Sequence, residues 1–161
     1  MGINLSPVWL LIVNILAWFF FHIVISLLMI QVSDQWLDKQ KRGFQSQSWE
    51  QDGRFWQDFL HIRQWKSYLP DGSMFLKESY NQTNLQGIEV EDLKKFIIET
   101  KRAELTHWLM ILPAFFFFIW NPPWAGIIMV LYALLFNLPL IVTQRYNRPR
   151  LERLYCIKKE K

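Results

Sequence analysis

Three long apolar stretches alternate with polar, charged stretches along the 161-residue chain. The first, residues 5–32, contains few polar positions and exceeds the roughly 20 helical residues that cross a hydrocarbon core. Residues 103–120 and 124–142 form two more, separated by Asn121-Pro122-Pro123, where consecutive prolines end a helix. The pattern predicts an all-α, single-domain membrane protein with three transmembrane helices, the last two forming a tight hairpin.

The section between the first two predicted spans, residues 33–102, is polar but rich in aromatic residues. Residues 50–65 (EQDGRFWQDFLHIRQW) place Phe55, Trp56 and Phe59 on one broad face, which is typical of an amphipathic helix in the headgroup region. A small soluble helical lobe packed on the membrane domain would show the same pattern, so both interpretations stay open. Turns are expected at 69–72 and 81–87, followed by a helix from about Ile88 that continues into the second span.

Several polar or helix-breaking residues lie inside the predicted spans. Pro113 and Pro139 each remove a backbone hydrogen bond where no water can replace it, and Asn137 is placed to compensate. His22 lies near the centre of the first span, with Trp18 one turn away, and we expect it to pack against protein.

The composition supports a membrane protein, because 52% of the residues are hydrophobic and 17% are aromatic. Cys156 is the single cysteine, so there is no internal disulfide and no multi-cysteine zinc pattern, and we predict neither metal nor cofactor. The net charge of +4 does not indicate a nucleic-acid partner, because the basic residues flank apolar spans. The expected partners are anionic membrane lipids and acidic or phosphorylated donors.

All Lys and Arg residues fall in two regions, residues 33–103 and the tail 143–161. The positive-inside rule therefore predicts an external N-terminus, a cytosolic middle section and a basic cytosolic tail, in a multi-pass protein of the cell membrane. The first span is expected to remain as an anchor, because no basic residue precedes it and it is longer than a signal peptide core.

The strongest candidates for chemistry are Glu104 and His107, which share one helical face at the start of the second span. Ionisable side chains at that depth are costly unless they are paired or face a wet cavity. The tail segment 143–151 (TQRYNRPRL) is predicted to emerge on the same membrane side, and it offers amides and guanidinium groups suited to phosphate or carboxylate. The candidate substrate- and donor-binding residues are Arg102, Asn137, Gln144, Arg145, Tyr146, Asn147, Arg148 and Arg150.

A simpler interpretation also fits these residues. Glu104 and His107 would then only cap a span among headgroups, and the arginines would only anchor the helix to lipid.

Three segments resemble the glycosyl-4,4'-diaponeurosporenoate acyltransferases, small membrane proteins of staphyloxanthin-type carotenoid synthesis. These segments are IIETKRAELTHW (97–108), NLPLIVTQRYNRPRL (137–151) and, more weakly, GRFWQDFLHIRQWK (53–66). The resemblance implies a membrane O-acyltransferase that esterifies a sugar hydroxyl of a glycosylated carotenoid, or of another glycolipid, with a fatty acyl group carried by coenzyme A or acyl carrier protein.

Attack of a sugar hydroxyl on an acyl thioester needs a base, an oxyanion donor and a site for the carrier phosphates. We predict His107 as the base, oriented by Glu104, with Asn137 or Gln144 at the oxyanion and Arg145 and Arg148 on the carrier. Glu-x-x-His is also half of a di-iron motif, but no second copy occurs. The alternative from another class is a non-catalytic lipid- or carotenoid-binding or assembly subunit. Three helices cover a long polyene only partly, which is compatible with a homo-oligomer in either case.

Overall fold

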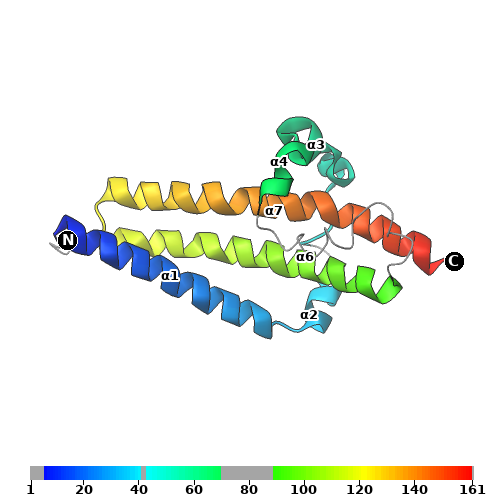
Figure 1. Cartoon of the computed structure of the whole chain (residues 1–161), viewed down its shortest axis with the longest axis horizontal. Helices are drawn as coiled ribbons and strands as arrows, with labels where there is room; N and C mark the ends of the chain where they lie inside the picture. Colours follow the sequence, from blue (N-terminus) through cyan, green and yellow to red (C-terminus); the bar gives the residue numbers. More distant parts are fainter. Residues whose placement is uncertain (1–5, 41–42, 70–88, 161) are drawn as a thin grey trace. The chain divides into compact units, whose positions relative to one another are not determined.

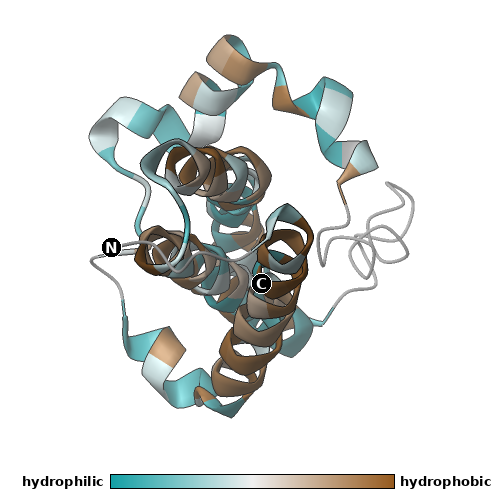
Figure 2. Ribbon diagram, turned by 90° about the vertical axis from the view of Figure 1, so that its left-hand side faces the viewer, coloured by the Kyte–Doolittle hydropathy of each residue, from teal (hydrophilic) through white to brown (hydrophobic). Residues whose placement is uncertain are grey.

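The computed structural model describes residues 6–40, 43–69 and 89–160, and these residues contain helices and no strands (Figure 1). Three of its segments are long and apolar enough to cross a membrane: Pro7–Gln31, Val90–Ile119 and Pro123–Lys159. The long helices are coloured as hydrophobic over much of their length (Figure 2). The predicted all-α class with three membrane-length helices is therefore confirmed.

The elements follow one another in a simple order. They are α1 (Pro7–Gln31), α2 (Asp34–Lys39), the 3₁₀ helix η1 (Ser48–Gly53), α3 (Arg54–Leu60), α4 (Ile62–Trp65), the 3₁₀ helix η2 (Lys66–Tyr68), α6 (Val90–Ile111), the 3₁₀ helix η3 (Leu112–Ile119) and α7 (Pro123–Lys159).

The chain divides into two compact units. The first, here called the span unit, comprises Met1–Ser33 and Leu105–Pro139; the second, the polar unit, comprises Asp34–Glu104 and Leu140–Lys161. The division falls inside α6 and α7, so each of these helices contributes to both units. Each unit is described by itself below.

Aromatic and amide contacts hold the span unit together. Trp18 of α1 stacks on Phe117 of η3, with ring centroids 4.7 Å apart, and its indole donates to the sulfur of Met129 at 3.3 Å. The His22 ring lies 5.8 Å from the ring of Trp18, which is one turn earlier in the same helix. Asn14 and Asn121 are buried and exchange two hydrogen bonds of 2.9 Å. Reciprocal pairing satisfies amides that the hydrocarbon would leave without partners.

Prolines act differently in the two long helical segments. At Pro113 the chain changes from α6 to η3, because proline cannot donate to the carbonyl one turn before it. Helix α7, in contrast, continues without a break through Pro139 and Pro149 to Lys159. The Asn137 amide donates to the carbonyl of Ala133 at 2.8 Å. In a helix, the backbone hydrogen bond that Pro139 removes would have been accepted by the carbonyl of residue 135. Because Asn137 donates to Ala133 and not to residue 135, the compensation expected from Asn137 does not form.

Residues 50–65 of the polar unit do not form the single amphipathic helix that their pattern predicts. They are divided among η1, α3 and α4, because Gln51, Asp52, Gly53 and His61 have positive φ angles. The resulting lobe packs on α7, where Ile62 joins Val142 and Tyr146 in a buried cluster. This packing favours the helical-lobe interpretation of the segment. The predicted turn at 81–87, and the one at 69–72 beyond Leu69, lie outside the described residues.

Gly53 allows the lobe to approach α7 closely. Its φ is 87°, and a Cβ at this position would lie 3.1 Å from the carbonyl oxygen of Tyr146. A side chain here would combine a left-handed backbone with an unusually tight contact to the backbone of α7.

Candidate functional site

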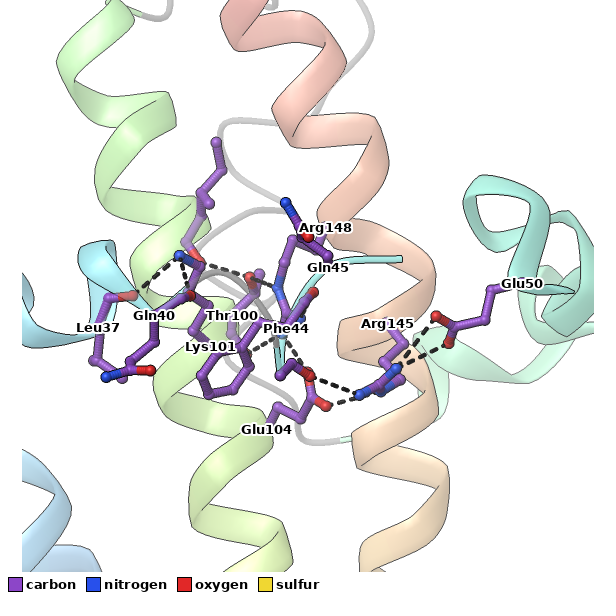
Figure 3. Close-up of polar contacts among 12 residues, drawn as sticks. Leu37, Gln40, Phe44, Gln45, Glu50, Thr100, Lys101, Glu104, Arg145 and Arg148 are labelled. Carbon is purple, nitrogen blue, oxygen red and sulfur yellow. Dashed lines mark hydrogen bonds and ion pairs between the residues drawn. The ribbon is translucent and has the colours of Figure 1, made fainter. Parts of the chain in front are cut away.

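Glu104 joins two arginines of α7 within the polar unit (Figure 3). Its Oε1 accepts from Nε of Arg145 at 2.8 Å, and its Oε2 accepts from Nη2 of Arg148 at 2.6 Å. Glu104 is only 1% exposed. A carboxylate at this depth needs opposite charge and hydrogen bonds to remain ionised, and the two guanidinium groups supply both.

Arg148 is also 1% exposed and is bound on several sides. Its Nε donates to the Thr100 hydroxyl at 3.0 Å, its Nη2 to the Thr100 carbonyl at 3.0 Å, and its Nη1 to the Phe44 carbonyl at 2.8 Å. The guanidinium carbon also lies 5.2 Å from the centre of the Phe44 ring. Arg148 therefore connects α7, α6 and the segment before η1.

Arg145 extends the cluster to a second carboxylate. Its Nη1 lies 3.2 Å from both oxygens of Glu50, and its Nη2 donates to the Gly43 carbonyl at 3.0 Å. Glu50 accepts in addition from the Trp56 indole at 2.9 Å and from the backbone amide of Gln47 at 2.7 Å. Two carboxylates and two guanidinium groups balance in charge, which is the condition under which a buried ionic network is tolerated.

Lys101 is a further buried cation next to the cluster. Its ammonium group donates to the carbonyls of Leu37, Asp38 and Gln40 at 3.0, 3.4 and 3.2 Å (Figure 3). These carbonyls belong to the end of α2 and the residue beyond it, where a cation complements the helix dipole. Lys101 therefore fixes α2 to α6 within the polar unit.

Tyr146, Asn147 and Arg150 lie on another face of α7, against α4 and η2. The Tyr146 hydroxyl accepts from Nε of Arg63 at 2.9 Å, and Asn147 accepts from the Lys66 ammonium at 3.3 Å. The Arg150 guanidinium lies 3.5 Å from the centre of the Tyr146 ring, and the Lys66 ammonium lies 5.0 Å from it. Three cations therefore surround one buried phenol, and we call this group the Tyr146 cluster.

His107 and Asn137 meet within the span unit. The Nδ1 of His107 lies 3.0 Å from Oδ1 of Asn137, while Nδ2 of Asn137 donates to the Ala133 carbonyl. Because a carbonyl can only accept, the Asn137 nitrogen must face Ala133 and its oxygen must face the imidazole. This arrangement assigns the proton of a neutral ring to Nδ1, so that Nε2 is the ring nitrogen without a proton.

The structure thus distributes the predicted site residues over three groups. Glu104, Arg145 and Arg148 form one, the Tyr146 cluster contains Tyr146, Asn147 and Arg150, and His107 pairs with Asn137 in the span unit. Gln144 is buried, and its amide has no hydrogen-bond partner among the described residues. Arg102 pairs with Asp34 and, at 3.2 Å, with Glu99.

Glu50 is the main residue that sequence reasoning missed. It follows Gln47 by three positions, and the two form a capping box at the start of η1. The usual sequence signal for that motif is Ser or Thr followed three positions later by Glu or Gln, and this segment shares only the Glu. The motif indicates a helix start, but nothing local indicates a contact with Arg145, 95 residues away.

These observations define a small helical membrane protein whose polar unit is built around buried, charge-balanced ion pairs. A profile described as glycosyl-4,4'-diaponeurosporenoate acyltransferase matches residues 40–156. The chain belongs to this family, and it is an acyltransferase. The family that the sequence segments suggested is therefore confirmed, and the enzymatic interpretation is favoured over a non-catalytic subunit.

Curated relatives match along most of the chain. The glycosyl-4,4'-diaponeurosporenoate acyltransferase of Staphylococcus aureus strain Newman is 38% identical over 144 residues, which are 89% of this chain and 87% of the relative. The enzyme of strain MRSA252 is 37% identical over the same shares of both chains. No solved structure is significantly similar to this chain.

Proposed function

We propose that this protein esterifies a sugar hydroxyl of a glycosylated carotenoid with a fatty acyl group taken from an acyl thioester. The observation that carries the proposal is the 38% identity over 89% of the chain to a relative whose name specifies acyl transfer and a glycosyl-4,4'-diaponeurosporenoate. The three membrane-length helices support a polyene-bearing acceptor, because such a molecule resides in the bilayer.

In this reaction the oxygen of the sugar hydroxyl attacks the thioester carbonyl carbon. His107 takes the hydroxyl proton on Nε2, the nitrogen that the Asn137 contact leaves without a proton. The tetrahedral oxyanion then collapses, the carbon–sulfur bond breaks, and the leaving thiolate receives the proton from the imidazolium. A positioned base of this kind contributes roughly a hundredfold to ten-thousandfold to the rate.

The orientation of His107 can be attributed to two residues. Glu104 precedes it by three positions in α6, and the sequence-based assignment of Glu104 as the orienting group remains part of the proposal. The contact between His107 and Asn137 supports Asn137 as a second orienting group, which fixes the tautomer. Gln144 is assigned to the oxyanion, because its amide has no hydrogen-bond partner among the described residues and can donate to a new charge.

The acyl carrier carries phosphate groups, whether it is coenzyme A or acyl carrier protein. The Tyr146 cluster supports a role for Tyr146, Asn147 and Arg150 in binding them, because Arg63 and Lys66 bring further positive charge to the same place. Arg145 and Arg148 are assigned to the donor site as well. Since their guanidinium groups already bind Glu50 and Glu104, their contribution is to position α7 for the donor.

The proposed orientation places the polar unit in the cytosol, where acyl thioesters are available. The support is the distribution of Lys and Arg, which avoid the N-terminus and the Pro122-Pro123 turn.

The decisive experiment combines purified protein, glycosyl-4,4'-diaponeurosporenoate and a fatty acyl thioester, and measures ester formation by mass spectrometry. We expect an acylated glycoside with the wild-type protein and loss of most activity with His107→Ala. His61→Ala is the matched control, because His61 is exposed in the polar unit. Absence of ester with every thioester tested would refute the proposed reaction, and normal specific activity of folded His107→Ala would remove His107 as the base.

A further inference from the structure

A pocket of about 590 Å³ opens in the polar unit between α6, α7 and the segment that follows α2. None of the residues assigned above to catalysis or to the donor lines it. Its walls include two aromatic rings, an aliphatic side chain and three polar groups. These residues are Phe44, Gln45, Ile97, Glu152, Tyr155 and Cys156.

Glu152 is the distinctive group in this pocket. It is half-buried, and no hydrogen bond or ion pair to its carboxylate forms within the described parts of the chain. Its nearest buried cations are already bound, since Arg148 pairs directly with Glu104 and Lys101 donates to three carbonyls near α2. The carboxylate is therefore available to accept hydrogen bonds from a ligand.

The combination of groups indicates the class of ligand. A pocket of a few hundred cubic ångströms with apolar walls and few polar groups is typical of small-molecule sites. Sugar hydroxyls donate to carboxylates and amides, and the C–H face of a sugar ring packs on aromatic rings such as Phe44 and Tyr155. Lys39, Lys94 and Lys101 also line the pocket, so the phosphate-bearing carrier of the acyl donor is the competing ligand that the test below includes.

We infer that this pocket binds the sugar head of the acceptor glycolipid, with Glu152 and Gln45 as hydrogen-bonding groups and Phe44 and Tyr155 as stacking surfaces. The inference rests on the proposed function, whose acceptor is a glycoside. At the rim, Lys94 and Asp38 form an ion pair of 3.3 Å and are each about half exposed. The two charges of this pair offset each other, and Lys39 adds a positive charge to the lining.

Cys156 provides a direct probe, because it is the single thiol of the chain, is exposed and lines the pocket. The rate of its alkylation by N-ethylmaleimide would be followed by mass spectrometry on the whole protein in a detergent without a sugar headgroup. The additions are glycosyl-4,4'-diaponeurosporenoate, the matched aglycone 4,4'-diaponeurosporenoate, and coenzyme A. We expect the glycoside to slow alkylation severalfold and the other two compounds to leave the rate unchanged.

Glu152→Gln gives a second measurement. Loss of a charge-assisted hydrogen bond should raise the KM for the glycoside roughly tenfold and leave the KM for the acyl thioester unchanged. Glu160→Gln is the matched control, because Glu160 is exposed beyond the end of α7 and does not line the pocket.

The outcomes separate this inference from the proposed reaction. Equal protection by glycoside and aglycone, protection by coenzyme A, or no protection would each overturn the sugar site even if ester forms. Glycoside-specific protection without any ester would support the sugar site and refute the proposed reaction.

Discussion

Substituting Glu104 by Gln removes the charge that Arg148 contacts while keeping the shape of the side chain. Glu104 is the only carboxylate in direct contact with Arg148 among the residues that the structure describes. Both side chains are almost completely buried. The new amide would also turn its NH₂ group toward one of two guanidinium donors, so one contact becomes repulsive.

The magnitude follows from this burial. Leaving one charge of a buried pair without its partner typically costs about 3–5 kcal/mol. Arg145 retains Glu50, with which it makes contacts of 3.2 Å, so the loss falls mainly on Arg148. The ratio of unfolded to folded protein should therefore rise roughly a hundredfold to a few thousandfold.

The assay is unfolding of the purified protein by sodium dodecyl sulfate in mixed micelles, followed by tryptophan fluorescence. Glu99→Gln is the matched control, because Glu99 lies on the same helix and forms an exposed pair with Arg102 at 3.2 Å. Such a pair contributes at most about 1 kcal/mol. Equal losses of stability for the two variants would refute the argument that the Glu104 cluster supports the fold of the polar unit.

The same variant tests the role that the sequence assigned to Glu104. If Glu104 orients His107, specific activity per folded molecule should fall together with stability, although less than in His107→Ala. If Glu104 acts only through Arg145 and Arg148, folded Glu104→Gln protein should retain near-normal specific activity. Measuring activity on the folded fraction therefore distinguishes an orienting role from a purely structural one.

Three further predictions follow from the structure. Gly53→Ala should lower stability by about 1–2 kcal/mol more than Gly43→Ala, because only Gly53 has a positive φ and a close backbone neighbour; equal effects in the same unfolding assay would contradict this. Asn137→Leu should lower specific activity roughly tenfold by freeing the imidazole tautomer, and a variant with unchanged kcat would show that the His107 contact has no catalytic role. Cys156 should react with an impermeant thiol reagent only after the membrane is opened, and labelling in intact cells would reverse the proposed orientation.

The extent of the helical spans could be predicted because it depends on local properties. A run of apolar residues of membrane length has few alternatives to a helix, since every backbone polar group must be satisfied internally. The Asn121-Pro122-Pro123 turn is likewise local, because proline excludes the helical hydrogen bond there. The third apolar run ends near Val142, whereas α7 continues to Lys159. The reason is tertiary: Tyr146 and Arg148 are buried against α4, α6 and the segment before η1, and these contacts stabilise the helix beyond the apolar run.

The candidate site shows more clearly where local reasoning ends. Spacing along a helix placed Glu104 beside His107, and it correctly identified a carboxylate that requires a partner at that depth. The hydrogen bonds that the structure shows for Glu104 are donated by Arg145 and Arg148, which lie 41 and 44 residues away in the sequence. The planar guanidinium group of each arginine presents its N–H donors in a fixed geometry. Charge-assisted bonds to a guanidinium are roughly twice as strong as neutral ones, so a buried carboxylate preferentially binds an arginine within reach. The residue type therefore predicts that a partner is needed, whereas only the packing of α6 on α7 within the polar unit determines which residue supplies it.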